Sequence, residues 1–110
     1  MTELDAALAR HAELFNAGVR DEDFTALVDT FAPTAVMRFV GVPAGPFVGR
    51  ESIARAYAES PPDDTMSIVE AHEAGPCTMQ ASFSWSRGGG GSMTVSWHDG
   101  QVIDLTVAFG

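Results

Sequence analysis

An unbroken alternation of apolar and polar residues at positions 78–86 constrains the fold more than any other feature of the sequence. In this segment, TMQASFSWS, the residues Met79, Ala81, Phe83 and Trp85 are separated by Thr, Gln and Ser. Successive side chains of a β-strand point to opposite faces of a sheet, so this pattern makes a strand with one apolar face. The chain must therefore contain a sheet whose apolar face is covered by another part of the molecule.

The segments on either side of this strand continue the same pattern. The stretch RGGGGS leads into a strand with apolar Met93, Val95 and Trp97, and Asp99-Gly100 is a typical hairpin turn. We expect the last strand to carry its apolar face on Ile103, Leu105, Val107 and Phe109. A less regular strand at 66–74 precedes them, so the second half of the chain predicts an antiparallel meander.

Helical periodicity dominates the first third of the chain. Leu4, Leu8, His11 and Phe15 fall on one stripe of a first helix, which Thr2 and Asp5 begin with a capping-box pattern. The residues Asn16-Ala17-Gly18 are expected to end this helix.

Two further helices are expected before the meander. Asp21 can cap a second helix whose apolar spacing continues to Phe31 and ends at Pro33. A strand at 35–40 and a Pro/Gly-rich loop then lead to a third helix at 51–59, with Ile53, Ala56 and Tyr57 on its buried side. Three short helices must cover the apolar sheet face, which predicts a two-layer α+β domain.

The composition limits the organisation and the partners of the chain. A length of 110 residues fits one domain, 1–110, and no apolar run approaches the roughly 20 residues of a membrane span. The formal net charge of −9 argues against binding to nucleic acid or to an anionic membrane. The N-terminal residues lack a basic leader and a long apolar stretch, so we expect a cytoplasmic protein. Cys77 is the single cysteine and is assigned no chemistry.

The polar face of the predicted sheet is unusual because it carries mainly uncharged Ser and Thr, with Asp104 as the main exception. A face of this kind suits contact with a second copy of the chain. We therefore expect a homodimer that forms through the sheet, with a solvated polar face as the alternative.

Several stretches, in this order, resemble a known family. They are RHAELFNAG at 10–18, LVDTFAPTAVMRFVG at 27–41, FVGRESIARAYAES at 47–60 and the closing LTVAFG. Together they are similar to the SnoaL-like and ketosteroid-isomerase-like branch of the nuclear transport factor two (NTF2)-like superfamily. The resemblance implies a cone-shaped fold of the cystatin-like kind, in which a curved antiparallel sheet wraps around three N-terminal helices and leaves a deep pocket. It also implies a homodimer, and its members include isomerases, polyketide cyclases, epoxide hydrolases and binding domains.

The resemblance places the catalytic groups of the ketosteroid isomerases at substituted positions. Their tyrosine of the first helix falls at His11, their general base at Arg38 and their protonated aspartate near Met93, whereas a supporting tyrosine is retained at Tyr57. A charged guanidinium cannot accept a carbon-bound proton, so a standard ketosteroid isomerase is not expected. An epoxide-hydrolase site is also not expected, because two carboxylates cannot be placed beside Arg38.

His11, Arg38 and Tyr57 are the candidate catalytic residues. His11 either is a buried core histidine or, oriented by Tyr57, acts as an acid, a base or a hydrogen-bond donor. Arg38 either faces the pocket and holds a substrate anion or enolate, or faces outward and pairs with an acid. Asp104 is a lesser candidate, because its place in the alternation points it away from the apolar face.

Alternation also identifies the wall of the expected pocket. It should be formed by the apolar side chains Phe15, Ala81, Phe83, Trp85, Met93, Leu105, Val107 and Phe109. No cofactor is expected. A metal site is not expected either, because Glu70, His72, His98 and Asp99 share residue type but no supporting pattern.

Three functions fit these observations. The first is an enzyme with isomerase-type or cyclase-type acid-base chemistry on a hydrophobic carbonyl compound, with His11 and Arg38 in the site. The second is a noncatalytic protein that binds a small hydrophobic molecule in the same pocket. The third is a dimerising accessory domain with a vestigial pocket.

Overall fold

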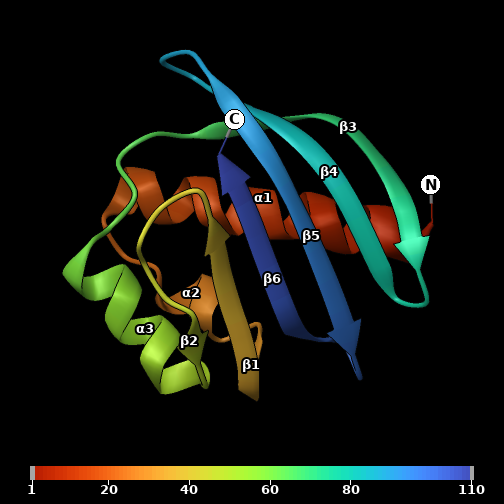
Figure 1. Ribbon diagram of the computed structural model, residues 1–110, viewed down its shortest axis with the longest axis horizontal. Helices are drawn as coiled ribbons and strands as arrows, with labels where there is room; N and C mark the ends of the chain where they lie inside the picture. Colours follow the sequence, from red (N-terminus) through yellow and green to blue (C-terminus); the bar gives the residue numbers. More distant parts are fainter. Residues whose placement is uncertain (1, 110) are drawn as a thin grey trace.

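A computed structural model describes residues 2–109 of the chain (Figure 1). Its strands form one six-stranded sheet in the order β2-β1-β6-β5-β4-β3. Strands β3 to β6 are an antiparallel meander, as expected, whereas β1 pairs with β6 in parallel. The strands are β1 (Phe31–Val40), β2 (Phe47–Val48), β3 (Met66–Gly75), β4 (Thr78–Trp85), β5 (Gly90–His98) and β6 (Gln101–Phe109).

All three helices lie on one side of the curved sheet, which gives the two-layer α+β architecture predicted from the sequence (Figure 1). The longest helix, α1, crosses the concave side of the meander, while the two shorter helices lie beside β1 and β2. The helices are α1 (Glu3–Asp21), α2 (Thr25–Val28) and α3 (Arg50–Glu59). In the described part of the chain, no helix has the length and apolarity needed to cross a membrane.

Helix α1 begins with the expected capping box between Thr2 and Asp5 but does not end where the sequence suggested. It continues through Asn16 and Gly18 to a left-handed residue, Glu22, with φ of 56°. The Asn16 side chain is engaged in two hydrogen bonds with the backbone of Met66, at 2.8 and 2.9 Å, instead of ending the helix. The Asn16-Ala17-Gly18 stop was therefore wrong, because tertiary contacts use these residues inside the helix.

The second helix is shorter than expected because β6 pairs with the segment that follows it. Phe31 lies opposite Val102 in the parallel ladder, and the Val102 N–H donates to the Thr30 carbonyl at 2.8 Å. Strand β1 therefore begins at Phe31, in a segment predicted to be helical. Pro33 falls within an irregularity between Phe31 and Val36, where a missing N–H is tolerated in a strand.

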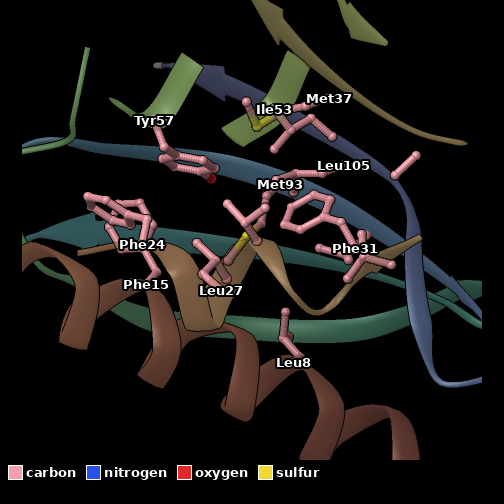
Figure 2. Close-up of a cluster of buried hydrophobic side chains, with 14 of the residues drawn as sticks. Leu8, Phe15, Phe24, Leu27, Phe31, Met37, Ile53, Tyr57, Met93 and Leu105 are labelled. Atoms are coloured by element: carbon pink, nitrogen blue, oxygen red, sulfur yellow. The ribbon is translucent and has the colours of Figure 1, made fainter. Parts of the chain in front are cut away.

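The core lies between the helices and the concave face of the sheet (Figure 2). Its fully buried side chains come from every layer and include Leu27, Phe31, Met37, Ile53, Met79, Val95 and Val102. Ile103 was expected on this face but is 38% exposed, because the register of β5 and β6 shifts between Ser96 and Trp97. This β-bulge turns Val102 inward in place of Ile103 and restores the expected phase at Leu105.

Candidate functional site

A cavity of about 470 Å³ lies between the helices and the concave face of the sheet. Most of the lining is apolar. Its polar groups are His11, Tyr57 and the residues at one rim of the cavity, which include Asp63, Asp64 and Arg87 and are called the mouth below. The lining residues are His11, Phe15, Met37, Phe39, Tyr57, Ser60, Pro62, Asp63, Asp64, Met66, Phe83, Trp85, Arg87, Gly88, Met93, Leu105, Val107 and Phe109. A volume of this size suits a small organic molecule.

His11 reaches the cavity from the buried stripe of α1. The residue is 4% exposed, and its ring packs edge-on against Phe31 with the centroids 6.1 Å apart. Its Nδ1 atom is buried and has no hydrogen-bond partner within residues 2–109. Burial lowers the pKa of His11 to about 4, so the imidazole is neutral at pH 7. A neutral imidazole has one donor and one acceptor nitrogen, so the buried Nδ1 has an unused capacity for a hydrogen bond.

Tyr57 reaches the same cavity from α3. Its ring stacks on Phe24 with centroids 4.9 Å apart, and Figure 2 shows its hydroxyl end directed toward the centre of the cluster. Burial raises the pKa of the Tyr57 hydroxyl, so this group also stays neutral at pH 7. The cavity therefore presents two neutral polar groups on opposite helices.

Most of the wall that alternation indicated does line the cavity. Seven of the eight expected residues contribute to the cavity lining: Phe15, Phe83, Trp85, Met93, Leu105, Val107 and Phe109. Ala81 does not reach the cavity: it is buried in the core at a register position between Ala71 and Met93. Its short side chain leaves the cavity wall to the larger residues around it.

Arg38 does not face the cavity, which corrects the inward orientation considered above. Its neighbours Met37 and Phe39 line the cavity, so the alternation of β1 places Arg38 on the opposite face of the sheet. There it forms an ion pair with Asp104 of β6, and the two side chains are 48% and 36% exposed. This is the outward alternative, in which Arg38 is a surface charge paired with an acid. Asp104 lies on the outer face, as its phase indicated.

The mouth of the cavity carries charged residues that sequence reasoning did not select. Asp64 accepts a hydrogen bond from the Ser86 hydroxyl and one from the Arg87 backbone N–H at 3.0 Å. The Arg87 guanidinium lies 3.3 Å from an Asp63 carboxylate oxygen and 3.7 Å from one of Asp64. These contacts join the connection after α3 to the β4–β5 turn across the mouth.

The mouth residues had only a weak signal in the sequence. Pro61-Pro62 indicated the end of a helix, and the stretch after Ser86 indicated a hairpin connection, but neither pattern shows that the two segments meet. The opposite charges of Asp63-Asp64 and Arg87 are the one feature that could have paired them.

A site for a metal ion was not expected from the sequence. Within residues 2–109, no three His, Cys, Asp or Glu side chains gather in an arrangement that could hold one. His98 and Asp99 lie at an exposed turn, with His98 Nε2 3.3 Å from a carboxylate oxygen of Asp99.

Solved structures identify the fold. The chain superimposes on the epoxide hydrolase/cyclase-like enzyme SalBIII of salinomycin pyran-ring formation with a TM-score of 0.78 and 15% identity, covering 98% of this chain and 91% of that one. A Bacillus subtilis protein named provisionally as an isomerase gives 0.75 and 14%, covering 99% and 90%. An NTF2-like protein of unknown function from Burkholderia xenovorans gives 0.74 and 18%, covering 97% and 82%.

These similarities confirm at the level of the fold the resemblance inferred from the sequence. No family profile matches the sequence, and no curated protein matches it. The chain thus has the fold of the NTF2-like proteins.

Proposed function

We propose that this chain, which has the NTF2-like fold, binds a small, mainly apolar molecule whose carbonyl or hydroxyl oxygen hydrogen-bonds to His11. The observation that carries the proposal is a buried imidazole without a partner at Nδ1 in the wall of an apolar cavity. A buried polar group without a hydrogen bond costs about 1–3 kcal/mol, so native proteins rarely keep one without a role. The proposal requires the imidazole ring to turn so that Nδ1 faces the cavity, where an oxygen atom of a bound molecule would supply the missing bond.

The cavity walls support a hydrophobic occupant. The Trp85 ring packs against Phe83 and Phe15, with ring centroids 5.0 and 6.1 Å apart, and the three rings line the cavity without filling it. A cavity filled by these rings would have favoured an accessory domain with a vestigial pocket. The open volume of about 470 Å³ favours binding of a molecule instead.

A second candidate function is acid-base catalysis of the isomerase or cyclase type on a carbonyl compound. It is favoured by the presence of both His11 and Tyr57 on the cavity wall. A neutral imidazole or phenol can donate a hydrogen bond to a carbonyl oxygen and stabilise the charge that develops on it. With a pKa of about 4, however, His11 is a weak base, which favours binding over proton abstraction.

We further propose that two copies of the chain associate through the outer face of the sheet, as the polar composition of that face suggested. In the middle of the face lie Ser82, Ser92 and Thr94, while Val40 and Val48 near one edge are 55% and 67% exposed. Sedimentation velocity should show a dimer for the wild type and a monomer for Thr94→Arg. The exposed-helix variant Glu13→Arg should remain dimeric, and a monomeric wild type would refute this contact.

The absence of a cofactor and the cytoplasmic location expected from the sequence stay predictions.

A thermal-shift screen of small apolar ketones, aldehydes and alcohols tests the proposed function. Compounds that stabilise the wild type should stabilise His11→Leu much less, whereas Arg38→Ala should respond like the wild type. Stabilisation by none of the compounds, or an equal response in His11→Leu, would contradict the proposal.

A further inference from the structure

The arginines near the cavity are paired with carboxylates, which affects whether the cavity can bind an anion. A carboxylate inside an apolar cavity needs a cation or several hydrogen-bond donors to offset its lost hydration. Arg38, the cation expected to supply this contact, lies on the opposite face of the sheet and is paired with Asp104. The strands contribute apolar and aromatic side chains to the lining, among which the Trp85 indole N–H is an uncharged donor.

Arg87 does belong to the cavity lining, but it is already paired with carboxylates at the mouth. It contacts the carboxylates of Asp63 and Asp64, so these three groups carry a net charge of −1 (two carboxylates and one guanidinium). An entering anion would have to displace one of these carboxylates from Arg87. The formal charge of the whole chain, −9, acts in the same direction.

From these observations we infer that the cavity selects neutral carbonyl compounds and excludes the corresponding carboxylates. Specificity then depends on the charge of the ligand as well as on its shape. The inference rests on the proposed binding function and narrows its ligand class.

A carboxylic acid can still enter in its protonated form, which makes the selectivity depend on pH. An acid with a pKa near 4 is protonated to about one part in a thousand at pH 7, and each unit of lower pH raises that fraction about tenfold. The ionisable groups that face the cavity are His11 from α1, Tyr57 from α3, Asp63 and Asp64 from the connection, and Arg87 from the β4–β5 turn.

The groups nearest a bound ligand do not titrate between pH 7 and pH 5. His11 stays neutral in this range because its pKa is about 4, and burial raises the pKa of Tyr57. At the mouth, the Ser86 hydroxyl and then the Arg87 N–H hold the pKa of Asp64 below its ordinary value. A change in relative affinity over this range therefore reports the charge of the ligand.

The test compares methyl naphthyl ketone with naphthoate, which have nearly the same shape, by isothermal titration calorimetry. At pH 7 the ketone should bind about a thousandfold more tightly, because only about one part in a thousand of the acid is neutral, and the gap should narrow about tenfold for each pH unit down to pH 5. Ketone affinity should be constant over this range, which serves as the internal control.

A charge reversal at the mouth provides a second readout. Asp63, which is 88% exposed, can be changed to Lys with little effect on folding, and the carboxylate affinity should then rise about threefold to tenfold. Glu13→Lys makes the same change in net charge on the exposed side of α1, away from the cavity lining, and should leave both affinities unchanged.

The possible results separate the inference from the function on which it rests. Ketone and carboxylate affinities within threefold at pH 7, or a gap independent of pH, would overturn the selectivity and leave the binding function standing. Failure of the ketone to bind would overturn the proposed function and the inference with it.

Discussion

The rings of Phe24 and Tyr57 stack with their centroids 4.9 Å apart and their planes inclined by only 19°. The same Phe24 ring occupies the space beside Gly18, where an added Cβ would lie 2.4 Å from its Cδ1 atom. Because Gly18 has no side chain, the Phe24 ring can pack between α1 and α3. This packing fixes the position of Tyr57 at the cavity.

Substitution of Gly18 by Ala should therefore destabilise the protein despite the higher helix propensity of alanine. The Phe24 ring would have to move, and overpacking of a core typically costs about 1–3 kcal/mol. Urea unfolding measures this loss. Gly75→Ala is the control, since nothing lies within 4 Å of an added Cβ there. An unchanged or increased stability in Gly18→Ala would show that Phe24 is not held as described.

The burial of His11 predicts a specific dependence of stability on pH. Its pKa falls from 6.5 in the unfolded chain to about 4 in the folded protein, so between these values only the unfolded state binds the proton. Stability should be unaffected by His11 above pH 6.5 and should fall by about 3 kcal/mol as the pH decreases to 4.

The contribution of His11 is isolated by comparing the wild type with His11→Leu in urea unfolding at pH 7, 6, 5 and 4. Carboxylates titrate in both proteins, so the difference between their pH profiles reports His11. Parallel profiles would mean that the folded protein accepts a proton on His11 without cost.

Arg38 should contribute little to stability and nothing to binding. The Arg38–Asp104 pair is substantially exposed, and such pairs contribute about 0–1 kcal/mol. A double-mutant cycle with Arg38→Ala and Asp104→Ala should give a coupling energy within this range, with the ketone affinity of each variant equal to that of the wild type. A tenfold loss of ketone affinity in Arg38→Ala would place this residue in the site after all.

The difference between the expected and the observed role of Arg38 shows what the pattern alone could decide. The alternation of β1 is visible in the sequence. Ala35, Met37 and Phe39 fall on one face of the strand, and Arg38 falls on the other face with Val36 and Val40. It allowed the outward orientation, but the resemblance to ketosteroid isomerases favoured the inward one. The alternation reports which of this chain's own residues are buried. The pairing of Arg38 with the general base of the ketosteroid isomerases assumes a catalytic residue that this chain does not have.

Local patterns predicted most of the elements and most of the cavity wall because both depend on which face of a strand or helix is apolar. They did not predict the end of α1, the start of β1 or the bulge at Ile103. Each of these depends on a distant partner: Met66 for Asn16, Val102 for Phe31 and the β5 strand for Ile103. The charged mouth was missed for the same reason, since Asp64 and Arg87 meet only in the folded chain.

The contact between Asp64 and the β4–β5 turn should be visible in hydrogen exchange. The Arg87 backbone N–H donates to the Asp64 carboxylate, and Asp64→Ala removes this acceptor. We expect the Arg87 amide to exchange about fivefold to tenfold faster in this variant. Asp63→Ala is the matched control, because the Asp63 carboxylate does not accept this bond. Equal exchange in wild type and Asp64→Ala would show that the turn is held at the mouth by other contacts.

A thermodynamic cycle measures most directly the hydrogen bond that His11 donates to the carbonyl oxygen of a ligand. Calorimetry would compare methyl naphthyl ketone with isopropenylnaphthalene, in which a CH₂ group replaces the carbonyl oxygen, in wild type and in His11→Leu. We expect His11→Leu to weaken ketone binding about fivefold to tenfold and to leave binding of the hydrocarbon nearly unchanged. Equal changes for the two ligands would contradict this expectation, because His11 would then be part of the cavity wall without recognising the oxygen.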